Sequence, residues 1–363
     1  MKSSGGAIGI FPLYCILSLA IGLMNHVLVI PPLLTEAERD AWITILGIIV
    51  PYLIWVTGIY YIMKKTRQQP LIPWLSQHYG NTLGWAVRIF FIAYLFLICA
   101  MTVRETAVWT HVSYLPRTPE FVLALTLVLF CYFAVQFGMR SIAITSGILL
   151  PLVVIFGDFV LTANLPKKDY TLLFPMLENG IGPVLKGGIY LGGGLVELVT
   201  ILLLQHHLKT RMRLWSLWLL AVFLVLLVLG PATAAIAEFG PFEAAKLRYP
   251  AYEQWRLVRI GKYINHVDFL SIHQWLSGAT MRISISLYIV IDLLNSGPKK
   301  FRTAWLISLC ILLVLVVGLP VSDMQYLFFL KHYYFPVTLS AVVLLSLGLL
   351  LLATFAKNKG EAE

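Results

Sequence analysis

The sequence predicts an all-α protein that crosses a lipid bilayer many times. Of its 363 residues, 59% are hydrophobic and only 12% are charged, whereas soluble domains carry about 25% charged residues. The mean hydropathy is +0.84, and the apolar residues form long segments separated by short polar ones. These observations predict a single transmembrane domain over residues 1–363, with no separate soluble domain.

A helix that spans the bilayer needs about 20 mostly apolar residues. The first apolar run is too long for the core of a signal peptide, which has about 7–15 residues, and is therefore interpreted as the first membrane helix. About ten segments meet the length criterion in all: 7–34, 42–63, 83–112, 119–137, 141–164, 184–206, 214–238, 267–294, 302–321 and 333–356.

Positive charge predicts the orientation of these segments. An even number of crossings places both termini on one side, and that side holds the basic clusters at 64–67 and 209–213 together with slightly more Lys and Arg in all. Cytoplasmic loops collect such residues, so we expect both termini in the cytoplasm. The net charge of +10 follows from the same bias, and no nucleic-acid partner is predicted.

The segment 184–206 contains an unusual glycine triplet, Gly192 to Gly194, which Glu197 follows. A glycine costs roughly 1 kcal/mol relative to alanine inside a helix. Two interpretations remain open. The triplet marks a broken helix whose freed backbone groups hold a ligand, or it lets neighbouring helices approach closely.

The first segment has a similar irregularity, because Asn25 and His26 follow Gly22 in the middle of an apolar run. Polar residues inside a membrane are expensive and usually functional. If the ten segments form two inverted repeats of five, over 7–164 and 184–356, the first and sixth helices correspond and both are interrupted. The resulting ligand-binding hypothesis comprises Gly22, Met24, Asn25, His26, Gly192, Gly193, Gly194 and Glu197.

Arg282 lies in the middle of the segment 267–294. An arginine there costs roughly 3 kcal/mol or more and needs a buried partner, for which Glu197, Glu105 and Asp158 are candidates. Arginine stays protonated, so Arg282 is either a structural salt bridge or a fixed cation that replaces a coupling ion. Ser284 either lines the same polar stripe or bonds its own helix. Glu105 is expected to be a structural charge.

The loop 239–266 is expected to contain an amphipathic helix on the extracytoplasmic surface, because Tyr252, Trp255 and Val258 recur at helical spacing. This helix either covers a vestibule as a lid or only packs at the interface.

No catalytic motif was found: the chain has no phosphate loop, HExxH sequence or nucleophile elbow. We therefore predict neither an enzyme nor a cofactor. His206 and His207 are adjacent, but no other potential ligand is near them in the sequence, so no metal site is predicted.

Several short motifs spread along the chain are similar to those of a known family. They are Asp40-Ala41-Trp42, Arg104-Glu105, "FPMLENGIGPVLKGG" at 174–188, Glu197, Tyr249-Pro250, Trp255-Arg256, Trp275 and Leu287-Tyr288. In these residues the chain resembles the spore germination permease family, the B subunits of germinant receptors in endospore-forming bacteria. The stretch at 174–188 is the most specific of the motifs.

The resemblance implies a fold like that of the amino acid–polyamine–organocation transporters, with a LeuT-type 5+5 inverted repeat and broken helices 1 and 6. It also implies residence in the inner membrane of the spore, with an A-type membrane subunit and a C-type lipoprotein as partners. The expected function is to bind a nutrient germinant, usually an amino acid, and to signal to those partners. Two alternatives remain: an amino acid permease, and a scaffold subunit whose pocket is vestigial because bulky residues follow Gly22.

Overall fold

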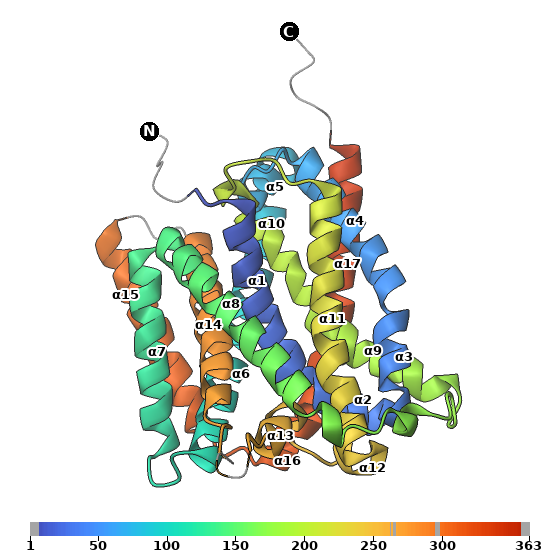
Figure 1. Cartoon of the computed structure of the whole chain (residues 1–363). Coiled ribbons are helices and arrows are strands. Elements are labelled where there is room, and N and C mark those ends of the chain that lie inside the picture. Colours follow the sequence, from blue (N-terminus) through green and yellow to red (C-terminus); the bar gives the residue numbers. More distant parts are fainter. Residues whose placement is uncertain (1–6, 262, 264–265, 295–297, 357–363) are drawn as a thin grey trace.

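The computed structural model describes residues 7–261, 263, 266–294 and 298–356, and these form a bundle of helices (Figure 1). The termini of the chain lie outside this range, so their predicted location is not described. In the first half the elements are α1 (Ile10–Met24), η1 (Asn25–Val29), α2 (Ile30–Ala37), η2 (Glu38–Asp40), α3 (Ala41–Gly47), α4 (Ile49–Lys65), α5 (Leu71–Tyr79), α6 (Asn81–Ser113), α7 (Glu120–Phe137), α8 (Met139–Ala163), η3 (Leu165–Lys167) and η4 (Tyr170–Leu173).

The second half contains α9 (Ile181–Leu195), η5 (Val196–Thr200), α10 (Ile201–Leu204), η6 (Gln205–His207), α11 (Leu214–Phe239), α12 (Pro241–Ala244), α13 (Pro250–Leu257), α14 (Leu270–Leu294), α15 (Lys299–Val317), α16 (Asp323–Phe329), η7 (Leu330–Tyr334) and α17 (Phe335–Phe355). The turns η1 and η7 are π-helical, and η2 to η6 are 3₁₀-helical.

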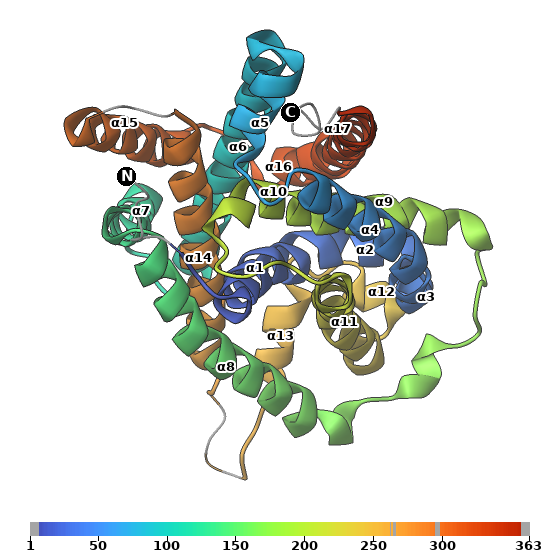
Figure 2. The ribbon, with the colours of Figure 1, turned by 90° about the horizontal axis from the view of Figure 1, so that it is seen from above.

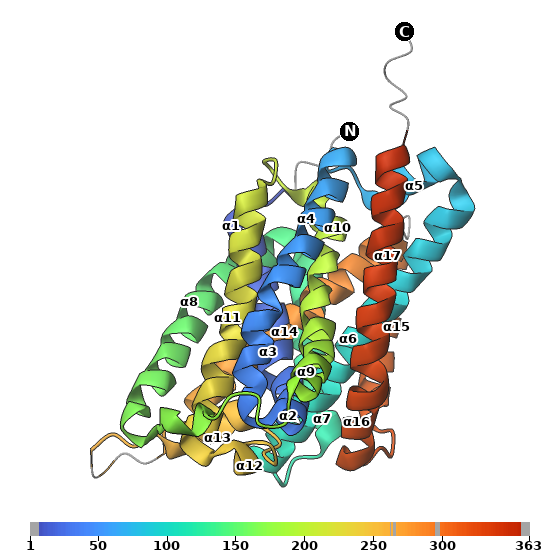
Figure 3. The same ribbon diagram turned by 90° about the vertical axis from the view of Figure 1, so that its right-hand side faces the viewer.

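Among the described residues, nine helical segments are long and apolar enough to cross a membrane. Each overlaps at least one of the ten predicted segments, and the span 10–47 also reaches the start of the segment 42–63. The remaining prediction, 42–63, corresponds to α3 and α4, of which α4 has 17 residues; Figure 3 shows the two in line. The chain is therefore a multi-pass membrane protein, and α1 begins at the same end of the bundle at which α17 ends (Figure 1).

The interrupted helices occupy the centre of the bundle. Within an apolar stretch of 18 residues, the spans 10–47, 181–207 and 270–294 are 83%, 89% and 83% buried, whereas the corresponding stretch of 139–163 is only 11% buried. Seen from above, α1 is surrounded by other helices while α7, α8 and α15 lie at the periphery (Figure 2). The peripheral helices expose apolar side chains, as the lipid-facing surface requires.

The two predicted interruptions exist, but neither is an unwound segment. Helix 1 changes from α to π winding over 25–29, and helix 6 changes to 3₁₀ winding over 196–200. The expectation that the glycine triplet itself frees its backbone N–H groups is wrong, because 192–194 lie within the continuous helix α9. The winding changes immediately after the triplet, at the turn that carries Glu197.

The glycine triplet lets α9 approach two neighbours closely. A Cβ on Gly193 would lie 2.8 Å from the backbone oxygen of Phe335 in α17, and one on Gly194 would lie 2.5 Å from Oδ1 of Asn25 in η1. A Cβ on Gly192 would lie 3.1 Å from Leu339. The packing interpretation of these glycines is thus the one that the geometry supports.

The substitution Gly193→Ala is expected to lower the free energy of unfolding by about 1–3 kcal/mol, because the methyl group would overlap the α17 backbone, which cannot move aside cheaply. Gly188→Ala in the same helix is the matched control: a Cβ there meets nothing within 4 Å. It should be neutral or stabilise by up to ~1 kcal/mol. Thermal unfolding of the purified variants measures the difference, and equal stabilities would contradict the packing role.

Candidate functional site

A fully buried ion pair between Arg282 and Glu197 lies at the centre of the bundle. Arg282 Nη2 donates to Glu197 Oε1 at 2.6 Å, and Nη1 donates to Glu197 Oε2, so the pair is bidentate. Arg282 Nε also donates to Thr102 Oγ1 at 2.8 Å, and Nη1 to the Ala20 carbonyl at 3.1 Å. The Tyr334 hydroxyl donates to Glu197 at 3.3 Å.

These contacts identify Glu197 as the partner of Arg282 among the three candidates. They join α14 to η5, α6, α1 and η7, five elements from distant parts of the sequence. Breaking such a pair by removing one partner is costly because the other charge stays buried. Ser284 is also buried on α14, but its hydroxyl has no hydrogen-bond partner among the described residues.

A small void of about 10 Å³ lies against Arg282, with room for about one water molecule. It lies between helix 1, α6 and α14, and Met24 is the one predicted ligand-binding residue in its lining. Its lining comprises Leu23, Met24, Val27, Leu28, Thr102, Glu105, Thr106, Trp275 and Arg282. The protein's own ion pair and apolar side chains therefore fill most of this position.

A larger cavity of about 320 Å³ lies beside it, between α1, α8, α11, α13 and α14. This volume falls within the range of small-molecule sites. Most of its lining is apolar, with a few polar groups that include Ser18, His26, Asp158, Ser271 and Gln274. These five polar groups come from helix 1, α8 and α14, and α13 adds Tyr252 and Gln254.

Three residues, Leu23, Val27 and Trp275, line both cavities. They form a thin wall, one side of which faces the large cavity and the other the void at Arg282. Leu23 and Val27 come from helix 1 on either side of its change to π winding. A molecule in the large cavity would therefore be one side chain away from the ion pair.

The helix α13, which lies in the loop 239–266, covers one end of the large cavity. Its Trp255 is 3% exposed and donates through Nε1 to Gln274 Oε1 at 2.9 Å. The Tyr252 ring lies 5.6 Å from that of Trp109, which stacks on Trp275 at 4.0 Å. Both Tyr252 and Trp255 line the cavity, and the lid remains a prediction.

Glu105 belongs to a second charged cluster, at the α13 end of the bundle. Arg248 Nη2 donates to Glu105 Oε1 at 2.6 Å, and Arg248 Nε donates to Asp323 Oδ2 at 3.1 Å. Burial opposes the charge on Arg248, but the neighbouring Glu105 carboxylate raises the pKa of Arg248 above its ordinary value. The cluster thus fastens the segment before α13 to α6 and α16.

The predicted ligand-binding residues divide into four groups, one of which is Glu197 alone, in the ion pair with Arg282. Gly22 and His26 line the large cavity, and His26 Nδ1 hydrogen-bonds the carbonyl of Gly22 at 2.9 Å. Met24 lines the void at Arg282. Asn25 faces the glycine triplet of α9 instead, and neither it nor the triplet lines the two cavities described.

Sequence reasoning missed the contribution of α8 and α11 to the large cavity. Residues such as Leu161 and Leu227 line it, but in the sequence they are ordinary apolar residues of membrane segments. It also missed the stacked pair Trp109–Trp275.

Comparison with known proteins shows which family this chain belongs to. The family described as "Spore germination protein" matches residues 10–325. "Spore germination protein XB" of Bacillus anthracis is 41% identical over 355 residues, which cover 98% of this chain and 100% of that protein. "Putative spore germination protein YfkT" of Bacillus subtilis (strain 168) is 27% identical and covers 76% of this chain and 75% of its own.

Among solved structures, the chain is similar to the crystal structure of MhsT in complex with L-phenylalanine. The TM-score is 0.65 at 13% sequence identity, over 98% of this chain and 94% of that one. At this identity the likeness concerns the fold alone. The bundle therefore has a transporter-like fold of the LeuT type.

The hydrogen bond from Arg282 to Thr102 allows a focused test of the buried ion pair. Thr102→Val leaves the charged Nε–H of Arg282 without an acceptor, which should cost about 1–3 kcal/mol of unfolding free energy. Thr126→Val in α7 is the matched control: like Thr102, Thr126 donates to the carbonyl four residues earlier, but its bond is exposed. Thermal unfolding of both variants should show a loss only for Thr102→Val; equal losses would contradict the account.

Proposed function

Because this chain belongs to the spore germination protein family, we propose that it is the B subunit of a germinant receptor and that it binds a small nutrient within its membrane domain. The observation that supports this most strongly is the large cavity, which meets helix 1 at Gly22 and His26. A binding subunit requires such a space. The cavity also borders the π turn of helix 1, and π turns are frequent at functional sites.

The composition of the cavity favours a small amphiphilic nutrient, and an amino acid with an apolar side chain fits it well. The apolar walls would hold the side chain. Asp158 would accept hydrogen bonds from an ammonium group, and His26 and Gln274 would orient the polar end of the ligand. Gly157 also lines the cavity, and a Cβ there would lie 3.5 Å from Nε2 of Gln274.

The thin wall suggests how ligand binding is coupled to the rest of the bundle. A ligand that presses on Leu23 or Trp275 would shift residues that also contact the void at Arg282. A ligand with different affinities for two arrangements of this wall changes their populations. In the proposed receptor, an A-type membrane subunit and a C-type lipoprotein would sense that change in the inner membrane of the spore, with both termini of this chain on the core side.

Transport is the second candidate function, because the fold is transporter-like. The buried guanidinium of Arg282 is a fixed positive charge at the centre of the bundle, and it would repel a coupling cation there. A scaffold subunit with a vestigial pocket is the third candidate, and the nearly filled central void is compatible with it.

A liposome assay separates the three functions. The purified protein is reconstituted, and radiolabelled amino acids retained per protein are counted at increasing concentration. The proposed binding subunit predicts saturable retention of at most one molecule per protein. Accumulation well above one would show a permease, and absence of saturable binding for all amino acids tested would favour the scaffold.

The cavity makes a more specific prediction about affinity. Asp158→Asn should weaken binding of the retained amino acid at least tenfold, because a hydrogen bond to a charged group contributes about 1.5–3 kcal/mol. Glu120→Gln, in the first turn of α7 and not in the cavity lining, is the control and should leave the affinity unchanged. Equal affinities of the wild type and Asp158→Asn would mean that the ligand binds outside the large cavity.

A further inference from the structure

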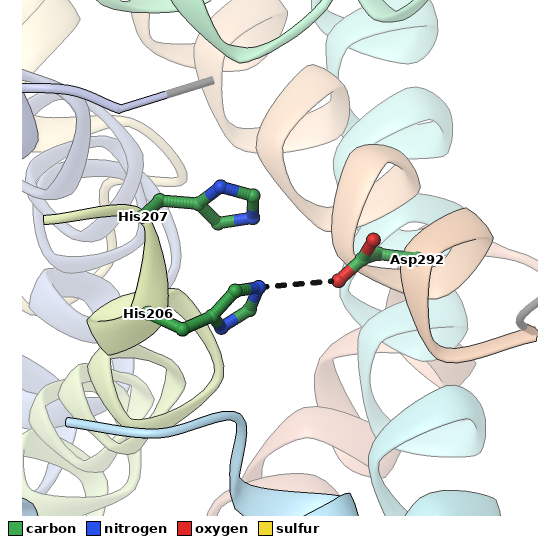
Figure 4. Close-up of side chains that lie close together, drawn as sticks. All are labelled: His206, His207 and Asp292. Atoms are coloured by element: carbon green, nitrogen blue, oxygen red, sulfur yellow. Dashed lines mark ion pairs between the residues drawn. The ribbon is translucent and has the colours of Figure 1, made fainter. Parts of the chain in front are cut away.

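Two adjacent histidines and one aspartate lie together at the end of the bundle where α1 begins. His206 and His207 are the last residues of η6, and Asp292 lies near the end of α14 (Figure 4). His206 Nε2 lies 3.6 Å from Asp292 Oδ2. One potential ligand atom from each of the three residues lies within 4.8 Å of the others. Figure 4 shows both imidazole rings extending from η6 toward α14.

The contacts among the described residues do not satisfy this cluster. A distance of 3.6 Å is too long for a hydrogen bond between His206 and Asp292. His206 Nδ1 is buried and has no hydrogen-bond partner within the described part of the chain. The centroids of the two imidazole rings lie 4.0 Å apart, with the ring planes at 40° to each other.

We propose that His206, His207 and Asp292 bind a divalent transition-metal ion, with Zn²⁺ as the best match. Two imidazole nitrogens and one carboxylate are a common protein ligand set for zinc, with water in the fourth position. Bond lengths of ~2.0–2.1 Å in a tetrahedral site imply ligand atoms about 3.3 Å apart. Small side-chain movements would bring the present atoms to that spacing.

The exposure of the cluster suits an exchangeable ion. The side chain of Asp292 is 40% exposed and that of His206 is 22% exposed, so an ion and a water ligand have access from one side. Arg302 acts against binding, because its positive charge acts on both Asp292 and His207. Its guanidinium lies 5.7 Å from the ring of Tyr288. Arg302 would limit the affinity and would need to turn away from a bound cation.

The position of the site indicates a consequence for conformation. The Ile8 N–H donates to the His207 carbonyl at 2.8 Å, so the segment before α1 is already attached to η6. A bound ion would attach η6 to α14 as well, and would hold three segments together at this end of the bundle. Any effect of this link on signalling rests on the proposed receptor function, whereas metal binding itself does not.

Co²⁺ titration of the purified, chelator-treated protein, produced with an affinity tag that contains no histidine, tests the site. Binding of one Co²⁺ per chain should give the intense visible absorption of a four-coordinate site, and Zn²⁺ should abolish it by competition. His207→Ala and Asp292→Asn should each weaken binding at least tenfold. His78→Ala, which removes a histidine of α5, should have no effect, and Arg302→Gln should tighten binding.

Absence of the absorption band would overturn the proposal, as would stoichiometric binding that neither substitution weakens. X-ray absorption spectroscopy of the wild type with one equivalent of Zn²⁺ provides a test that does not depend on the variants being folded. The site predicts imidazole scattering in a short first shell, and a first shell without imidazole would contradict it. Neither measurement involves a germinant, so failure here would leave the proposed function untouched.

Discussion

A guanidinium group in the interior of a membrane protein must be paired, and the centre of this bundle is arranged around that requirement. Arg282 is 1% exposed, and four of its five N–H groups are used by Glu197, Thr102 and Ala20. The departures from α-helical winding gather around this pair. Glu197 lies in the 3₁₀ turn η5, and Tyr334 is the last residue of the π turn η7.

A third irregular turn, η1, packs close to the helix that leads to Glu197, because the glycine triplet leaves room for it. Gly194 allows Asn25 of η1 to come close to α9, immediately before the turn that carries Glu197. Gly193 does the same for the start of α17. The glycines thus contribute to function through packing: they bring together the segments from which the ion pair is built. The large cavity lies on the other side of helix 1, and Leu23 and Trp275 separate it from Arg282.

Hydropathy was sufficient to predict the membrane segments, because the bilayer imposes length and composition on each of them independently. It also identified Arg282 as a residue in need of a partner. It left Glu197 as one of three candidates, because the sequence does not show which faces of the helices meet. The glycine triplet was ambiguous for a similar reason, since small residues serve both breaks and close packing.

The sequence patterns did not predict contacts between distant segments. His206 and Asp292 are separated by α11, α12, α13 and most of α14, so proximity in the chain gave no indication of their cluster. The large cavity depends on the relative placement of α8 and α11, whose lining residues are typical of any membrane helix. Family motifs supplied what these patterns lacked: the resemblance at 174–188 pointed to the family that the comparisons then showed.

A double-mutant cycle on the buried ion pair tests the central claim most directly. The unfolding free energies of the wild type, Glu197→Gln, Arg282→Gln and the double variant are measured under identical conditions. If the pair organises the core, each single substitution should cost about 3–5 kcal/mol, and the double variant should cost clearly less than the sum of the two. Additive losses would show that the two residues act independently and would contradict the account.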